Sequence, residues 1–114
     1  MCLVLFALRV HEDYPFIILA NRDEFFDRPT LAANLWPGYP EIAAGRDLLA
    51  GGTWLGLTRQ GMFATITNYR EVSPAPPSPF SRGQLVLDRL LLSSQAPTKA
   101  APRPDYLDQY SGFN

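Results

Sequence analysis

The sequence is poor in the residues that most often mark disulfides and metal sites, and it has no excess of charge. It contains one cysteine and one histidine among 114 residues, and its formal net charge is −1. A single cysteine excludes an internal disulfide and suits a reducing compartment. Near-neutral charge provides no electrostatic footprint for nucleic acid or for an anionic membrane surface. We therefore expect neither as a partner.

Long hydrophobic runs are also missing. The longest, residues 2–8, is far shorter than the roughly 20 residues that a membrane-spanning helix needs. It follows Met1 directly, without the basic segment that opens a secretory signal. We expect no transmembrane segment and a cytoplasmic location, with an organelle lumen such as the mitochondrial matrix as the alternative.

The chain does have enough apolar residues for a packed core, with 46% hydrophobic and 12% aromatic residues. Its length fits one domain. Two apolar runs, residues 2–10 and 16–20, flank a polar turn at residues 11–15 and predict a β-hairpin. Because the runs are continuous rather than alternating, we expect this hairpin to be buried on both faces.

The rest of the chain predicts more strands, then helices. Residues 42–45 read as a short strand, and residues 53–58 and 62–68 as a second hairpin. Loops are expected at residues 36–40, 73–79 and 96–104, where proline and glycine gather. Helices are predicted at Arg82–Ser93, capped by Ser81, and at Asp105–Gln109.

These elements predict an α+β fold. With four predicted strands and one long helix, the sheet would be covered on one face only, whereas the apolar pattern of the strands predicts burial on both faces. We therefore expect residues 1–114 to be the N-terminal portion of a single larger domain. Residues 112–114 read like a turn that opens another strand.

Cys2 is the first candidate for chemistry. Removal of Met1 would leave it with a thiol and a free α-amine. That amine has a reference pKa of about 8, so it can accept the thiol proton without help from a histidine. The alternative is that Cys2 is a small buried hydrophobic residue, as free cysteines often are.

A polar cluster at residues 21–24 follows the second apolar run. Hairpin pairing brings the start of the first strand beside the end of the second, so Cys2 and Arg22 should lie close together. A guanidinium there would favour the thiolate, and a carboxylate could hold the α-ammonium.

Two other interpretations of the cluster stay open. An arginine–carboxylate network could simply hold a loop in place, with Asp27 and Arg28 as further members. A metal site made by Asp23, Glu24 and Asp27 is the third option, although no histidine or cysteine joins them at ligand spacing.

Asn68 ends a predicted strand, and its amide could donate to an oxyanion. Equally, asparagine is a common strand terminator. The glycine-rich residues 51–56 allow close backbone approach but lack the lysine and hydroxyl residue of a phosphate-binding loop.

Several blocks together resemble the NRDE family, the family of the transport and Golgi organisation protein. These blocks are Met1-Cys2, Ala20-Asn21-Arg22-Asp23-Glu24-Phe25, Arg28-Pro29, Gly51-Gly52-Thr53-Trp54-Leu55-Gly56, Gly61-Met62-Phe63-Ala64, Thr67-Asn68-Tyr69-Arg70 and Ser81-Arg82-Gly83. They cover nearly the whole chain and are specific as an ordered set. Members of the family look about twice as long, which agrees with the expected truncation.

The NRDE family is in turn similar to N-terminal nucleophile hydrolases of the choloylglycine hydrolase and penicillin V acylase group. That likeness implies an αββα sandwich in which Cys2 attacks an amide carbonyl and Arg22 stabilises the thiolate. Asp23 or Glu24 would orient the α-amine, and Asn68 would donate to the oxyanion. The relatives space arginine and aspartate three apart, whereas Phe25 stands at that position here.

Three functions follow as alternatives. The first is amide hydrolysis or acyl transfer on a small-molecule substrate, with no cofactor. The second is a non-catalytic role on the same scaffold in haem or lipid binding or in trafficking, with haem as a ligand and a Golgi-associated or mitochondrial location. The third is a truncated product with little activity of its own. The oligomeric state is left open.

Overall fold

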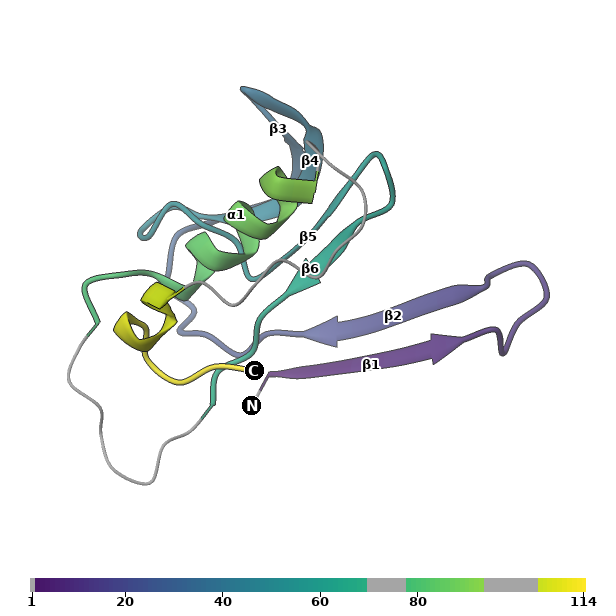
Figure 1. Ribbon diagram of the computed structural model, residues 1–114, viewed down its shortest axis with the longest axis horizontal. Helices are drawn as coiled ribbons and strands as arrows, with labels where there is room; N and C mark the ends of the chain where they lie inside the picture. The colour runs from purple at the N-terminus through teal and green to yellow at the C-terminus, as the bar shows by residue number, and fades with distance from the viewer. Residues whose placement is uncertain (1, 70–77, 94–104) are drawn as a thin grey trace.

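The computed structural model describes residues 2–69, 78–93 and 105–114 of the chain (Figure 1). This part contains two antiparallel sheets, one α-helix and one short 3-10 helix, so the α+β class is confirmed. The elements in chain order are β1 (Leu3–Leu8), β2 (Phe16–Asn21), β3 (Thr30–Trp36), β4 (Tyr39–Asp47), β5 (Leu55–Thr58), β6 (Phe63–Thr65), α1 (Arg82–Ser93) and η1 (Asp105–Gln109).

Strands β1 and β2 form the predicted N-terminal hairpin. Their antiparallel register runs from Leu3 opposite Asn21 to Leu8 opposite Phe16. The hairpin extends away from the other elements, and its turn lies at its far end (Figure 1). The start of β1 and the end of β2 therefore lie side by side at the end nearer the rest of the molecule, as the sequence predicts.

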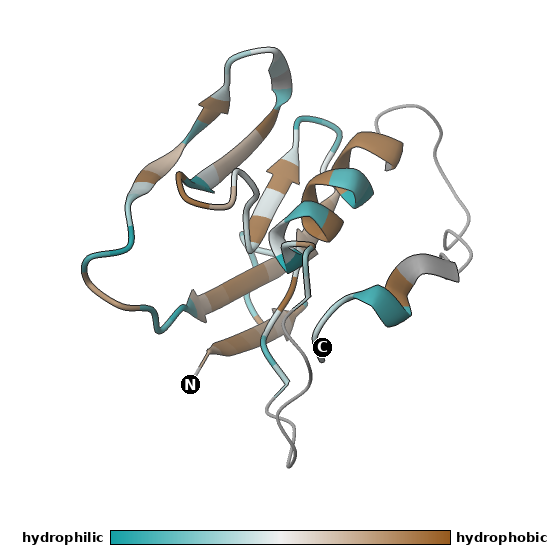
Figure 2. Ribbon diagram, turned by 90° about the vertical axis from the view of Figure 1, so that its left-hand side faces the viewer, coloured by the Kyte–Doolittle hydropathy of each residue, from teal (hydrophilic) through white to brown (hydrophobic). Residues whose placement is uncertain are grey.

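The prediction that this hairpin is buried on both faces is wrong for the described structure. Leu8 is 67% exposed on one face and Leu19 is 63% exposed on the other. The ring of Phe6 stacks on Phe16 and meets Phe63 of β6 edge-on, with ring centroids 6.0 and 6.3 Å away. Figure 2 shows both strands as mainly hydrophobic. An apolar pattern indicates that a strand suits burial, but it does not specify which segment covers it.

The second sheet has the order β3-β4-β5-β6 and confirms the predicted strand at residues 42–45 and the second hairpin. The expected loop at residues 36–40 is shorter than predicted. Trp36 pairs with Tyr39, so only a two-residue turn remains, with Gly38 at a φ of 83°. Glycine suits this position because a side chain is strained at positive φ.

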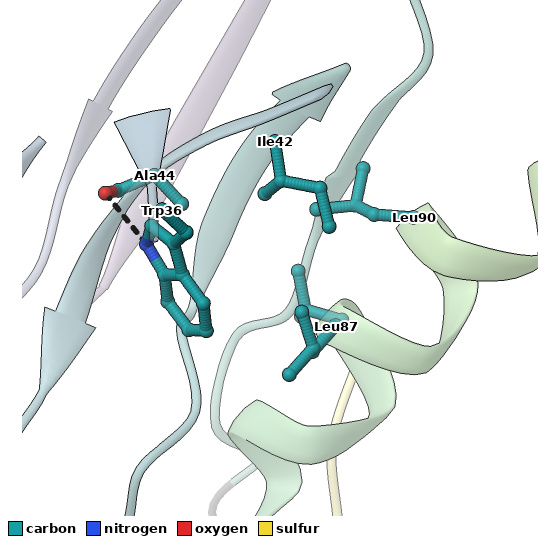
Figure 3. Packing of buried hydrophobic residues seen from close by; sticks show 6 residues of the cluster. Trp36, Ile42, Ala44, Leu87 and Leu90 are labelled. Atoms are coloured by element: carbon teal, nitrogen blue, oxygen red, sulfur yellow. Dashed lines mark hydrogen bonds between the residues drawn. The ribbon is translucent and has the colours of Figure 1, made fainter. Parts of the chain in front are cut away.

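Helix α1 covers one face of this sheet (Figure 1). It has the predicted bounds, and the Ser81 hydroxyl accepts a hydrogen bond from the Gly83 amide at 3.3 Å, as in a helix N-cap. Figure 3 shows Leu87 and Leu90 of the helix facing Ile42 of β4. The core also includes Trp36, whose indole nitrogen donates to the Ala44 carbonyl oxygen at 3.0 Å.

Two backbone contacts bring together segments that are far apart in the sequence. A methyl group added at Gly52 would lie 2.5 Å from the Gly83 carbonyl carbon, so the loop before β5 touches the start of α1. Phe113 forms an isolated antiparallel bridge with Asn68. Residues 112–114 thus pair with the chain after β6, as expected for a strand opening. The predicted loops at residues 73–79 and 96–104 lie outside the described residues, apart from Ser78 and Pro79.

Candidate functional site

A cavity of about 750 Å³ lies where the two sheets meet the start of α1. Its wall includes the residue before β1, the residues that follow β2, the end of β4 and the loop before β5. The five predicted site residues all line it, namely Cys2, Arg22, Asp23, Glu24 and Asn68. Ser111, near the other end of the described chain, lines it too, and the volume is typical of small-molecule sites.

Cys2 lies at this cavity because of the hairpin register. Leu3 pairs with Asn21, so Cys2 comes opposite Arg22, where β2 ends. The Cys2 side chain is half-buried, and its Sγ donates a hydrogen bond to Oδ1 of Asp23 at 3.2 Å. The structure thus brings the thiol to a carboxylate of the cluster.

Arg22 and Glu24 form a separate pair. Nη2 of Arg22 lies 2.9 Å from Oε2 of Glu24 and 3.7 Å from Oδ2 of Asp47. The pKa of Glu24 is lowered, first by the hydrogen bond from the Phe25 amide and then by the Arg22 guanidinium. The two acids that the sequence leaves as alternatives therefore have different partners, the thiol for Asp23 and the guanidinium for Glu24.

Asp47, at the end of β4, is the site residue that the sequence analysis missed. Its Oδ2 accepts a hydrogen bond from Nε of Arg28 at 2.8 Å and lies 2.8 Å from Nη2 of the same guanidinium. Its Oδ1 accepts from the amides of Leu49 and Ala50 at 2.9 and 3.0 Å. An aspartate before a turn is a sequence signal for the second set of bonds, but no sequence spacing relates position 47 to position 22.

Electrostatics at Asp47 are the sum of opposing effects. Burial by itself raises the pKa of its carboxyl, but the hydrogen bonds from Arg28, Ala50 and Leu49 outweigh burial, so that the pKa is lowered overall. The Asp47 carboxylate in turn raises the pKa of Arg28. The cluster of Arg22, Glu24, Arg28 and Asp47, called here the ion-pair cluster, therefore pairs two cations with two anions. Such pairing fits the predicted loop-holding network, with Asp47 in place of Asp27.

Asn68 also lines the cavity. Among the described residues, its side chain makes no hydrogen bond with Cys2 or with the ion-pair cluster. His11 lies in the hairpin turn, where its Nδ1 accepts from the Asp13 amide at 3.1 Å.

Across residues 2–69, 78–93 and 105–114, no three potential metal ligands gather into a site. Nor does any helix there have the length and apolar character to cross a membrane.

The arrangement combines a nucleophilic atom with groups that can bind polar substrate atoms. A thiol with an adjacent carboxylate can take part in proton transfer, and guanidinium and amide groups can donate to a developing oxyanion. Arg82 also lines the cavity, and its Nη1 donates to the Gly112 carbonyl oxygen at 2.8 Å. These groups suit covalent or binding chemistry at a carbonyl.

Comparison with known proteins gives the chain a family. It is 35% identical over 123 residues to the Transport and Golgi organization 2 homolog of Mus musculus, covering 100% of this chain and 44% of that protein. It is 32% identical over 96 residues to the Transport and Golgi organization protein 2 of Drosophila melanogaster, covering 77% and 34%. The chain thus spans less than half the length of these relatives. The family model described as Transport and Golgi organisation 2 matches residues 1–114, and the chain therefore belongs to this family.

Proposed function

We propose that Cys2 is the nucleophile of an N-terminal cysteine site for amide hydrolysis or acyl transfer on a small-molecule substrate. The observation that carries this proposal is the hydrogen bond from Cys2 Sγ to Asp23 in a cavity of about 750 Å³. Two antiparallel sheets are compatible with the N-terminal nucleophile hydrolase sandwich, which is part of the proposal.

The chemistry requires removal of Met1. The free α-amine of Cys2 would then accept the thiol proton, and the thiolate would attack the substrate carbonyl carbon to form a C–S bond. Collapse of the tetrahedral intermediate breaks the C–N bond, and the departing amine takes the proton from the α-ammonium. Water, or another acyl acceptor, then cleaves the thioester and regenerates the thiol. Asp23 would orient the α-ammonium, and Arg22 and Asn68 would stabilise negative charge.

Two measurements on the purified chain test this proposal. Intact-mass analysis should show that Met1 is absent. Incubation with p-nitrophenyl acetate should then add one acetyl group, located at Cys2 by peptide mapping. We expect the adduct to be lost in Cys2→Ala and retained in Asp27→Asn, because Asp27 is not among the residues lining the cavity.

A retained Met1 would overturn the mechanism, because the amine would be blocked in an amide bond. Acetylation that persists at the same rate in Cys2→Ala would overturn it as well, because the nucleophile would then be another group.

A second proposal is a non-catalytic role on the same scaffold, in haem or lipid binding or in trafficking, with a cytoplasmic, Golgi-associated or mitochondrial location. The relatives' names refer to transport and Golgi organisation rather than to hydrolysis. The exposed apolar side chains of β1 and β2 suit such a ligand. A haem titration should shift the Soret band, and the shift should weaken in Leu8→Lys. An unshifted band would reject the haem version.

A further inference from the structure

We propose that Asp47 is a positioning residue for Cys2: through Arg22 and Arg28 it holds Asp23 against the thiol. The assignment of a role in catalysis rests on the proposed function of Cys2. The coupling between Asp47 and Cys2 rests only on the contacts of the ion-pair cluster and on the hydrogen bond from Cys2 to Asp23.

Hydrogen bonds hold both the backbone and the side chain of Asp47. Its amide donates to the Gly52 carbonyl oxygen at 2.9 Å, and its carbonyl oxygen accepts from Gly51 at 2.8 Å. One carboxylate oxygen accepts from two turn amides and the other from Arg28, and only 14% of the side chain is exposed. Hydrogen bonds between charged groups, such as that from Arg28 to Asp47, are shorter and stronger than neutral ones. Asp47 is therefore a fixed anchor at the end of β4.

The ion-pair cluster also contacts the segment that carries Asp23. Residues 22–25 lie beyond the end of β2 and outside any helix or strand. Arg28 Nε lies 3.7 Å from Glu24 Oε2, and Arg22 Nη2 lies within 4 Å of both Glu24 and Asp47. The ion-pair cluster thus ties this segment to the second sheet.

Asp23 lies between two residues whose side chains the cluster holds. Restraining Arg22 and Glu24 restrains the Asp23 backbone between them, and so directs its carboxylate at Cys2 Sγ, 3.2 Å away. Loss of the Asp47 charge should release this segment and weaken the contact. If Asp47 acts in this way, its effect on Cys2 passes through Asp23 rather than acting directly through space.

A double-mutant cycle tests that route. The rate at which iodoacetamide alkylates Cys2 at neutral pH is measured in the wild type, Asp23→Asn, Asp47→Asn and the double variant. Asparagine at position 47 keeps an oxygen for the turn amides and removes the charge that Arg28 needs. Each single change removes or loosens the hydrogen bond that holds Sγ at the Asp23 carboxylate. The sulfur is then freer to meet the reagent, so each should raise the rate by about threefold or more. The double variant should react no faster than Asp23→Asn alone.

Two other variants keep the test decisive. Asp47→Glu should return the rate to within about twofold of the wild type, because it restores the charge. Arg28→Gln breaks the same ion pair from the other side and should behave like Asp47→Asn, which covers the case in which Asp47→Asn fails to fold. Asp27→Asn, on the same loop but outside the cavity wall, should leave the rate unchanged.

The proposal would be overturned if the rate increase in the double variant equalled the product of the two single increases, because independent effects add in free energy. An unchanged rate in folded Asp47→Asn would also overturn it. The cycle can succeed even when Met1 is retained and no acyl adduct forms, an outcome that rejects only the proposed function. Conversely, an acyl adduct at Cys2 with a multiplicative cycle rejects only the role of Asp47.

Discussion

At the scale of single residues, neighbours in the chain have different interaction partners. Asp23 and Glu24 are adjacent, but one accepts a hydrogen bond from a thiol and the other pairs with Arg22. The sequence could show that two acids follow β2 without showing which one meets Cys2. The directions of the side chains that follow β2 depend on the ion-pair cluster. Its member Asp47 comes 23 residues after Glu24 in the sequence.

The carboxyls of Asp47 and Glu24 predict a defined loss of stability in acid. Each has a lowered pKa in the folded protein, so the unfolded chain binds more protons as the pH falls through the ordinary value, about 4. Their stabilising contribution is complete above that value and is lost as the pH falls through the folded pKa. In urea unfolding at a series of pH values, Asp47→Asn should lose less stability below about pH 4 than the wild type. Parallel curves would contradict this prediction.

Gly52 carries another prediction at this scale. A Cβ there would lie 2.5 Å from the Gly83 carbonyl carbon and 2.7 Å from its oxygen, and backbone atoms of a helix start cannot turn away. We expect Gly52→Ala to lower the free energy of unfolding by roughly 1–3 kcal/mol, the usual cost of overpacking. The matched control is Gly38→Asn, at a turn with nothing within 4 Å and a positive φ that asparagine tolerates. Equal effects of the two changes would reject the close-approach argument.

At the scale of elements, local signals predicted α1 better than any strand. Ser81, the spacing of leucines and a proline-rich segment on either side define α1 within the sequence itself. Strand β3 was not predicted, because Thr30–Trp36 contains two alanines and an asparagine and forms by pairing with β4 across register shifts. Strand formation there depends on a partner strand rather than on local preference.

Two leucines of α1 provide a matched test of which face of the helix is buried. Leu90 is 1% exposed and contacts the core, whereas Leu92 is 55% exposed. Leu90→Ala should lower the free energy of unfolding by about 2–5 kcal/mol, because it removes buried methyl groups and leaves a cavity. Leu92→Ala should cost less than about 1 kcal/mol. Chemical denaturation of both variants measures this difference, and similar values would contradict the packing of α1 on β4 and β5.

At the scale of the whole molecule, the core and the candidate site are in different places. The core lies between α1 and the second sheet, whereas Cys2 lies at the base of a hairpin that extends away from it (Figure 1). A two-stranded hairpin is marginally stable by itself. Contacts that support it include the ring contact of Phe6 with Phe63 and the ion-pair cluster.

This division predicts uneven protection in native-state hydrogen exchange. Amides of β1 and β2 that are hydrogen-bonded across the hairpin should exchange at least about tenfold faster than those that join β4 to β5, because fewer buried contacts oppose local opening. Mass spectrometry of peptides from each region, or nuclear magnetic resonance, gives the comparison. Equal protection in the two sheets would show that the hairpin opens only when the whole chain unfolds.

The sequence by itself determined the hairpin, the helix with its cap, the meeting of Cys2 with the end of β2 and the family to which the motifs belong. These features depend on local preference, on antiparallel pairing across a short turn or on residue identity. Only the tertiary structure decided that Asp23 is the partner of the thiol, that Asp47 joins Arg22 and Arg28, and that the hairpin strands are exposed. These features depend on contacts between segments far apart in the chain, whose geometry the folded backbone sets.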